Sequence, residues 1–158
     1  FENFDLLLLH LDADVAGMNY AAGSIAPQAS DGSLPCARPC PPSSDTTDVL
    51  RAVLSSWCGA PTVPYRTVVC MPSKSTEAWV VAALFPADQY LRAGIECFPN
   101  PEARLGQQTL RRRIRKNQRD YLAHSVRLEH AWPGIATRGW LVEALRFQSE
   151  FLAAVNAV

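Results

Sequence analysis

The sequence lacks several features that would assign it directly to a class of proteins. Fifteen lysines and arginines balance 15 aspartates and glutamates, so no overall field draws the chain onto nucleic acid. No stretch approaches the roughly 20 consecutive apolar residues of a membrane span, and the first residues lack the basic region of a signal peptide. We therefore expect no membrane partner, and any binding of nucleic acid must depend on a local group of basic residues.

Paired cysteine motifs are also absent. Five cysteines, an odd number, are scattered along the chain: Cys36, Cys40, Cys58, Cys70 and Cys97. This pattern fits a reducing compartment better than a disulfide framework, and we predict a cytoplasmic location. Cys36, Cys40 and Cys58 could supply thiolates to zinc, but no Cys-x-x-Cys or histidine pair completes a set of four ligands.

The bulk composition indicates an ordinary globular protein. The chain has 158 residues, of which 48% are hydrophobic and 19% charged, enough to bury a real core. It begins at Phe1 and not at a methionine. We therefore expect a partial chain, in which a preceding segment carries a further strand.

One apolar run ends in two carboxylates. Residues 4–11 are typical of a central strand of a parallel sheet, buried on both faces, and Asp12 and Asp14 follow directly. Ligands of such sheets gather beyond the carboxyl ends of the strands. Residues two apart in an extended chain share a face, so both carboxylates can reach one cation such as Mg²⁺ or Mn²⁺. The simpler interpretation is a polar turn after a strand.

A second strand is predicted over residues 65–71, which are rich in β-branched side chains. A polar turn follows at 72–76, and then a helix over 77–85. Strand, helix, strand and helix in this order predict a parallel sheet whose strands deliver polar residues to the same edge. Glu77, in the first turn of the second helix, either caps that helix or supplies a third metal oxygen. Lys74, in the turn, is a candidate for substrate binding.

The segment between these strands divides into a loop and a helix. Residues 18–44 are rich in Ala, Gly, Ser and Pro and predict a loop of unusual length, either a lid or a surface insertion. A helix over 45–57 follows, because its apolar residues share one face: Val49, Leu50, Val53, Leu54 and Trp57.

Residues 111–119 contain six basic residues and no acidic one. On a helix, Arg112, Lys116 and Arg119 would share one face and could neutralise phosphates. The alternative is a solvated helix face, although like charges four residues apart destabilise a helix.

The C-terminal part is predicted to be helical. Asn100 is expected to cap a short helix. A long amphipathic helix follows, and its apolar stripe packs either in the core or against a protein partner or second copy. The stripe consists of Trp140, Ala144, Phe147, Phe151 and Val155, widened by Leu141, Leu145 and Leu152. None of His10, His124 and His130 has the spacing of a metal ligand, and His10 is expected in the core or at the sheet edge.

These elements predict an α/β fold with a small, mainly parallel sheet, flanking helices and a helical C-terminal part. We expect residues 1–98 to form an α/β metal-binding core that includes the long loop 18–44. Residues 99–158 are expected to form a helical subdomain.

The order of the elements resembles the TOPRIM-related bacterial proteins of the overcoming-lysogenization-defect nuclease type. The resemblance rests on Asp12-x-Asp14 after one strand and on the Glu77-Ala78-Trp79 segment after the next, and it covers about residues 4–84. The pattern of that family also includes a glutamate after an earlier strand, which here would precede Phe4.

The resemblance implies Mg²⁺-dependent hydrolysis of phosphodiesters in nucleic acid. Asp12 and Asp14 would hold the metal, Glu77 matches more loosely as a third ligand, and Lys116 would stabilise phosphate charge. We expect the substrate itself to be bound by Lys74, Arg112 and Arg119.

Other functions fit parts of the same sequence. Haloacid-dehalogenase-like phosphatases use the first aspartate of such a pair as nucleophile, but their motif requires Thr or Val where this chain has Ala16. The residues Leu11-Asp12-Ala13-Asp14-Val15 resemble the motif with which nucleotide-sugar glycosyltransferases hold Mn²⁺ on a diphosphate. A third possibility is a non-catalytic subunit that docks a partner through its last helix.

Overall fold

The protein is seen here as a computed structural model that describes residues 5–19, 34–59, 62–88, 94–109, 112–137 and 139–157. The first half contains β1 (Leu7–His10), the 3₁₀ turn η1 (Ala13–Gly17), α1 (Ser44–Trp57), β2 (Thr67–Cys70) and α2 (Glu77–Leu84). The second half contains the 3₁₀ turn η2 (Ile95–Cys97), α4 (Pro101–Gly106), α5 (Gln118–Thr137) and α6 (Val142–Asn156). The mixture of helices with two parallel strands confirms the predicted α/β class.

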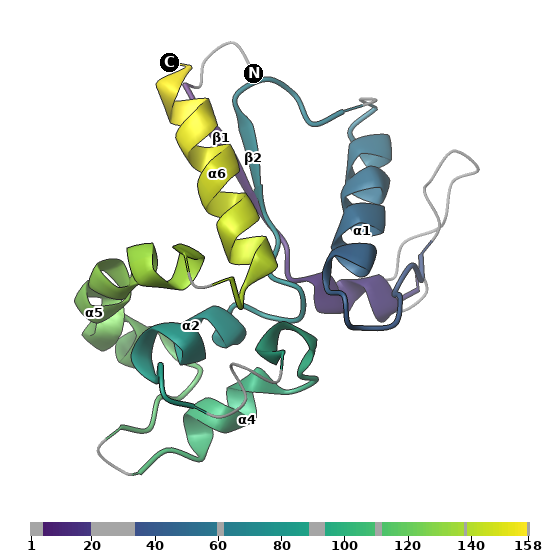
Figure 1. Ribbon diagram of the computed structural model, residues 1–158. Coiled ribbons are helices and arrows are strands. Elements are labelled where there is room, and N and C mark those ends of the chain that lie inside the picture. The colour runs from purple at the N-terminus through teal and green to yellow at the C-terminus, as the bar shows by residue number, and fades with distance from the viewer. Residues whose placement is uncertain are drawn as a thin grey trace.

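The two strands pair in parallel, with Leu7 opposite Thr67 and His10 opposite Cys70. Both strands therefore end at the same edge of the sheet, as predicted. Figure 1 shows η1 leaving this edge on one side, while α2, α4 and α5 gather beyond the carboxyl ends of the strands. Much of the predicted loop 18–44 lies outside the described residues, so its proposed role as a lid stays a prediction.

Strand β1 is less buried than predicted. Leu8 is 50% exposed and His10 is also exposed, whereas Val68 and Val69 of β2 are fully buried. In the described ranges the sheet has only two strands, so β1 has one neighbour. The expectation that this apolar run is buried on both faces is therefore wrong for the described sheet.

Two helices predicted from apolar spacing and capping are confirmed. In α1, Leu50 and Val53 are buried, although Trp57 at its end is 45% exposed. In α4, the Asn100 side chain accepts a hydrogen bond from the Ala103 N–H at 3.0 Å, as expected for a cap. None of the helices in the described ranges is both long and apolar enough to cross a bilayer.

The predicted basic helix over 111–119 is wrong. Residues 112–117 are not helical, and α5 begins only at Gln118. Asn117 accepts a hydrogen bond from the Asp120 N–H at 2.9 Å, which is the contact of an N-cap residue. Like charges four residues apart, such as those of Arg112 and Lys116, oppose helix formation, and the Asn117 cap starts the helix after all of the run except Arg119. Arg112, Lys116 and Arg119 therefore do not share a helical face.

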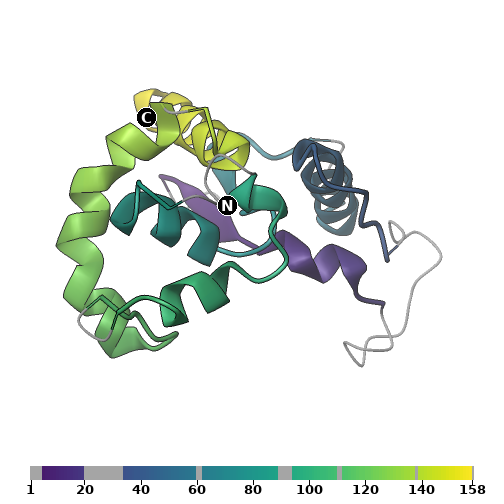
Figure 2. The ribbon, with the colours of Figure 1, turned by 60° about the horizontal axis from the view of Figure 1, so that its bottom comes forward.

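One apolar cluster joins the predicted core and the predicted C-terminal subdomain. It contains Cys70 of β2, most of α2, and residues from both sides of position 98, including Ile95, Leu105 and Ile135. The rings of Trp79, Trp132 and Phe147 meet with centroid separations of 5.5–6.0 Å, which links α2, α5 and α6. Figure 2 shows α5 curving along the outer side of α2 toward α6. The two predicted parts thus share their packing.

Only part of the apolar stripe predicted on the last helix is buried in the core. Ala144 is fully buried, and Trp140 and Phe147 pack against the core cluster. By contrast, Leu145, Leu152 and Val155 are 43%, 50% and 44% exposed. The residues predicted to widen the stripe therefore include two, Leu145 and Leu152, that face solvent.

Cys40 and Cys97 form a disulfide bond, which corrects the expectation of unpaired cysteines. The two residues are 57 positions apart, and only the packing of the segment before α1 against η2 brings them together. Sequence spacing carries no signal for such a pair. The bond also removes Cys40 from any zinc site, and it removes the cysteine-based reason for predicting a reducing compartment.

A buried polar network holds α6 against the rest of the fold. The Glu96 carboxylate accepts hydrogen bonds from the Ser43 hydroxyl at 3.0 Å and from the backbone N–H groups of Val142 and Glu143 at 2.9 and 3.1 Å. The fully buried Glu143 accepts from Thr47 at 2.8 Å. Burial raises the pKa of both carboxyls despite these donors, so their ionised forms are destabilised in the fold.

We predict that Glu143→Gln changes how stability depends on pH. A carboxyl whose pKa is raised on folding stabilises the native state fully below its unfolded pKa of about 4.5, and this contribution is lost as pH rises through the folded pKa. Urea unfolding should therefore show the wild type losing stability relative to the glutamine variant above about pH 4.5, by about 1.4 kcal/mol for each unit by which the pKa is raised. The matched exposed variant Glu129→Gln should show no such trend. A difference between wild type and Glu143→Gln that is constant with pH would contradict the prediction.

Candidate functional site

Asp12 is held at the carboxyl edge of the sheet by the turn that precedes α2. Its Oδ1 accepts hydrogen bonds from the Thr76 backbone N–H at 3.2 Å and from the Thr76 hydroxyl at 3.1 Å. His10 Nε2 lies 3.1 Å from Thr76 Oγ1 and 3.6 Å from Asp12 Oδ1. The Ala13 N–H also donates to the Pro72 carbonyl at 2.9 Å, which fixes η1 against the same turn. Parallel pairing of β1 and β2 thus brings residues 64 positions apart into contact.

Glu77 is the centre of a second group at this edge. Its side chain is only 5% exposed, and Oε1 accepts a hydrogen bond from the Tyr121 hydroxyl at 2.8 Å. Lys116 Nζ lies 3.3 Å from the same oxygen and 3.7 Å from Glu102 Oε2. Glu77 therefore joins α2 to the start of α5, in addition to its place in the first turn of α2.

The charges of these groups influence one another. Partial burial of its carboxyl group raises the pKa of Asp14, an otherwise exposed residue, and the negative charge of Asp12 raises it further, while a hydrogen bond from the Val15 N–H and the charge of Lys116 lower it. Burial would also raise the pKa of Glu77, but hydrogen bonds from Ser75 and Tyr121, together with the charge of Lys116, outweigh burial and lower it. Glu77 in turn is the main reason that the pKa of Lys116 is raised. At neutral pH this gives an ionised Glu77 and a cationic Lys116.

The second oxygen of Glu77 is buried and makes no hydrogen bond of ordinary geometry with the described residues. A buried carboxylate oxygen without a hydrogen-bond partner is costly. Burial and the Glu77 hydrogen bond together raise the pKa of Tyr121. Tyr121 thus remains a hydrogen-bond donor at neutral pH.

The predicted three-carboxylate metal site is not seen as an assembled cluster. Across the described ranges, no group of three or more His, Cys, Asp or Glu side chains is placed to hold a metal ion together. Asp14 is exposed on η1, whereas Glu77 is buried and engaged by Tyr121 and Lys116. Mg²⁺ is commonly bound through one or two carboxylates plus water and substrate phosphate. Asp12 and Asp14 supply that number of oxygen donors, but Asp14 lies in a 3₁₀ turn and not in the extended segment that was expected to place both carboxylates on one face, and metal binding stays a prediction.

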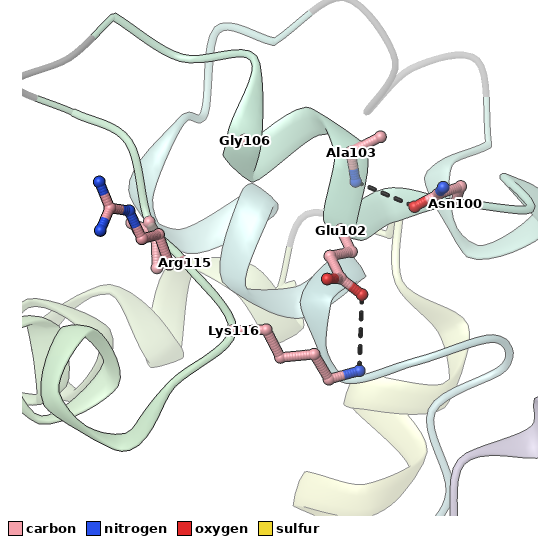
Figure 3. Close-up of a pocket in the computed structure, with 7 residues that line it drawn as sticks. Asn100, Glu102, Ala103, Gly106, Arg115 and Lys116 are labelled. Carbon is pink, nitrogen blue, oxygen red and sulfur yellow. Dashed lines mark hydrogen bonds and ion pairs between the residues drawn. The ribbon is translucent and has the colours of Figure 1, made fainter.

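A cleft of about 430 Å³ lies beside this edge and is lined by α4 and by the segment before α5. Figure 3 shows Lys116 reaching across it toward Glu102, while Arg115 points away from Glu102. Lys116 thus contacts both the cleft and Glu77. The remaining polar lining includes Asn100, whose side chain is engaged in capping α4.

The predicted substrate-binding residues are not brought together. Lys74 is partly buried in the turn before α2, and Arg119 is exposed on the first turn of α5. Arg112 is also exposed and lines a different cavity, of about 280 Å³, next to Asp88 and Gln108. Of the predicted basic residues, Lys116 is the one in contact with a predicted acidic residue of the site.

Comparison with protein-family models, curated proteins and solved structures finds no match. The resemblance to TOPRIM-related nucleases therefore stays a prediction that rests on the residues quoted for it.

The prediction of the site omitted Thr76, Tyr121 and Glu102. Thr76 stands in the polar turn directly before Glu77, so its proximity to Asp12 followed from the predicted parallel pairing. Tyr121 and Glu102 carried no comparable signal, because their contacts with Glu77 and Lys116 depend on how α5 and α4 pack against α2.

We predict that Tyr121→Phe destabilises the fold in a pH-dependent way. The variant loses the hydrogen bond to the ionised Glu77, with a cost of about 1–3 kcal/mol. Because that bond lowers the pKa of Glu77, the stability it contributes is present above pH 4.5 and is lost as pH falls through the folded pKa.

Urea unfolding at pH 7 and at pH 3 measures this loss, and Tyr65→Phe is the control. The Tyr65 hydroxyl also donates a hydrogen bond, but to a backbone carbonyl, and the residue is 75% exposed. An equal loss for both variants, or a loss for Tyr121→Phe that does not diminish at low pH, would count against the ionised Glu77.

Proposed function

We propose that this edge of the sheet binds a divalent cation, Mg²⁺ or Mn²⁺, and hydrolyses phosphodiesters of nucleic acid. One observation carries the proposal. The parallel register of β1 and β2 places Asp12 against the turn that leads to Glu77, so that carboxylates from two strands and the Lys116 ammonium group share one edge. In phosphodiester hydrolysis, carboxylates can hold the cation and an ammonium group can offset the charge that develops on the phosphate.

Asp12 and Asp14 would hold the cation. Burial is the main cause of the raised pKa of Asp14, and the like charge of Asp12 adds to it; a cation between the two carboxylates would relieve that repulsion. The cation, when bound, polarises the phosphate and lowers the pKa of the attacking water.

Lys116 would offset the negative charge that develops on the phosphoryl group. Its raised pKa keeps it cationic, and its side chain is 55% exposed, so a phosphate from solvent can reach it. Glu77 holds Lys116 in place and is proposed as a further acidic ligand. A run of exposed basic residues adjoins Lys116 and would attract the nucleic-acid backbone: Arg112, Arg113, Arg115 and Arg119. Lys74 is proposed to contribute to substrate binding from the turn before α2. A cytoplasmic location also remains a proposal.

We predict that Mg²⁺, Mn²⁺ or Ca²⁺ raises the thermal midpoint of the wild type and that the rise vanishes in Asp12→Asn. Binding to the native state alone contributes about 2.7 kcal/mol at a hundredfold excess over Kd. Asp45→Asn, which changes an exposed aspartate on α1, should keep the full rise. No rise with any of the three ions would overturn the metal site.

Hydrolysis assays then separate the proposed activity from the glycosyltransferase-like alternative. Single- and double-stranded DNA and RNA are incubated with Mg²⁺ or Mn²⁺, and a UDP-sugar is titrated in parallel. Cleavage of nucleic acid that is lost in Asp12→Asn and Lys116→Ala supports the proposal. Metal-dependent binding of the UDP-sugar without cleavage supports the alternative.

A second proposed function rests on a different observation, the exposed apolar side chains of α6. Val142, Leu145, Leu152 and Val155 are 43–51% exposed on one helix. A helix with such a surface is typical of a contact with a protein partner. We propose that α6 docks a protein partner or a second copy of this chain, and the second copy can be tested on the chain alone.

We predict that light scattering over a range of concentrations gives a mass above that of one chain and that the double variant Leu145→Ser/Leu152→Ser shifts it to the monomer. Substituting exposed side chains should leave the unfolding midpoint nearly unchanged. The matched control is Leu122→Ser on α5, where Leu122 is 65% exposed. A wild type that is monomeric at all concentrations would exclude self-association through α6.

A further inference from the structure

The disulfide bond joins the two segments that hold the start of α6. Cys40 lies shortly before Ser43 in the segment that leads into α1, and Cys97 directly follows Glu96 in η2. The Ser43 hydroxyl donates to the Glu96 carboxylate at 3.0 Å, and both residues are buried. The same two segments are therefore connected twice, once by a covalent bond and once by a buried hydrogen bond.

The Glu96 carboxylate in turn caps α6. It accepts hydrogen bonds from the backbone N–H groups of Val142 and Glu143 at 2.9 and 3.1 Å. The first N–H groups of a helix have no acceptor within the helix, and Leu141 at the N-cap position has no polar side chain that could serve them. The position of the first turn of α6 thus depends on η2, and the disulfide ties η2 to the segment before α1.

A reductant in solution can reach this bond. Cys40 and Cys97 are both partly exposed, whereas the free cysteines Cys36 and Cys70 are buried. Burial raises the pKa of both buried thiols, for Cys70 to about 11, which keeps them protonated and unreactive at neutral pH. Neither buried thiol is therefore suited to attack the bond from within, and its opening depends on thiols supplied from outside.

A dithiol reductant opens such a bond in two exchange steps. Its first thiolate attacks one sulfur and forms a mixed disulfide, while the other cysteine leaves as a thiolate and takes up a proton. The second thiolate of the reductant then attacks the mixed disulfide, releases the remaining cysteine and closes the reductant into a cyclic disulfide. The protein gains two electrons and two protons, and the reductant loses them.

We propose that the Cys40–Cys97 bond is a redox-sensitive clamp on α6. When oxidised, the bond fixes Glu96 against the first turn of the helix; when reduced, it lets that turn open while the rest of the fold persists. The apolar cluster around α2, against which Phe147 of α6 packs, contains neither cysteine and does not depend on the bond. Disulfides persist in oxidising surroundings and are reduced in the cytosol, so the surroundings set the state of the clamp. This inference is independent of the proposed metal site.

Counting reactive thiols in the folded chain tests whether the bond can be opened. An alkylating reagent without denaturant should modify one thiol, the exposed Cys58, before reduction. After treatment with dithiothreitol it should modify three, because Cys40 and Cys97 are added. Near-ultraviolet circular dichroism should stay close to that of the oxidised chain, which shows that side-chain packing is retained.

Amide hydrogen exchange by NMR tests the connection to α6. The N–H groups of Val142 and Glu143 should exchange about tenfold faster in the reduced chain, which corresponds to the loss of one hydrogen bond. The matched control is the N–H of Asp120, in the first turn of α5, which donates to the Asn117 side chain and should keep its rate.

Substitutions separate the bond from other effects of the reductant. The double variant Cys40→Ser/Cys97→Ser should show the faster exchange without any reductant. Cys58→Ser, which removes an exposed free thiol, should behave as the wild type in both states. Should the double variant fail to fold, the reduced wild type decides the question through the same measurements.

Three results would overturn the clamp. The first is a bond that resists dithiothreitol in the folded chain. The second is an exchange rate at Val142 and Glu143 that is the same in both states. The third is loss of the near-ultraviolet signal on reduction, because a chain that unfolds as a whole uses the bond only as a structural cross-link.

Discussion

The parallel pairing of β1 with β2 is the constraint on which the candidate site depends. Asp12 belongs to the first strand connection, whereas Thr76 and Glu77 belong to the second, and only the register His10 opposite Cys70 brings them to one edge. A slip of one residue would turn every side chain of β1 to the opposite face and break both hydrogen bonds between Thr76 and Asp12. Helix α6 packs against β2, and α2 packs against both α4 and α5.

Buried polar groups stabilise the arrangement around that pairing. The Glu96 carboxylate accepts hydrogen bonds from the first backbone N–H groups of α6, and the Glu77 carboxylate accepts one from the Tyr121 hydroxyl at the start of α5. The two carboxylates have different electrostatic environments, because the pKa of Glu96 is raised by burial while that of Glu77 is lowered by its donors and by Lys116. Glu96 is thus a structural group whose ionisation is opposed by the fold, and Glu77 is one whose ionisation the fold supports.

The sequence predicted what depends on local pattern and missed what depends on packing. The apolar spacing in α1, the Asn100 cap and the two strand ends were all visible, so the edge that holds Asp12 and Glu77 could be predicted. The prediction of a helix over 111–119 was wrong because Asn117 caps α5, which therefore begins only at Gln118. The spacing of basic residues on a possible helix face did not reveal this cap. The Cys40–Cys97 bond and the contact between Tyr121 and Glu77 join segments 57 and 44 residues apart, and no spacing rule reports such distances.

The ion pairs of Lys116 have a consequence for the medium in which the protein works. More than half of the Lys116 side chain is exposed, whereas the hydrogen bond from Tyr121 ends on a carboxylate that is almost fully buried. Dissolved salt screens the first kind of contact and hardly affects the second. As ionic strength rises, the hydrogen bond between Tyr121 and Glu77 therefore persists while the ion pairs of Lys116 weaken. The position of the Lys116 ammonium group in the cleft thus depends on the salt concentration.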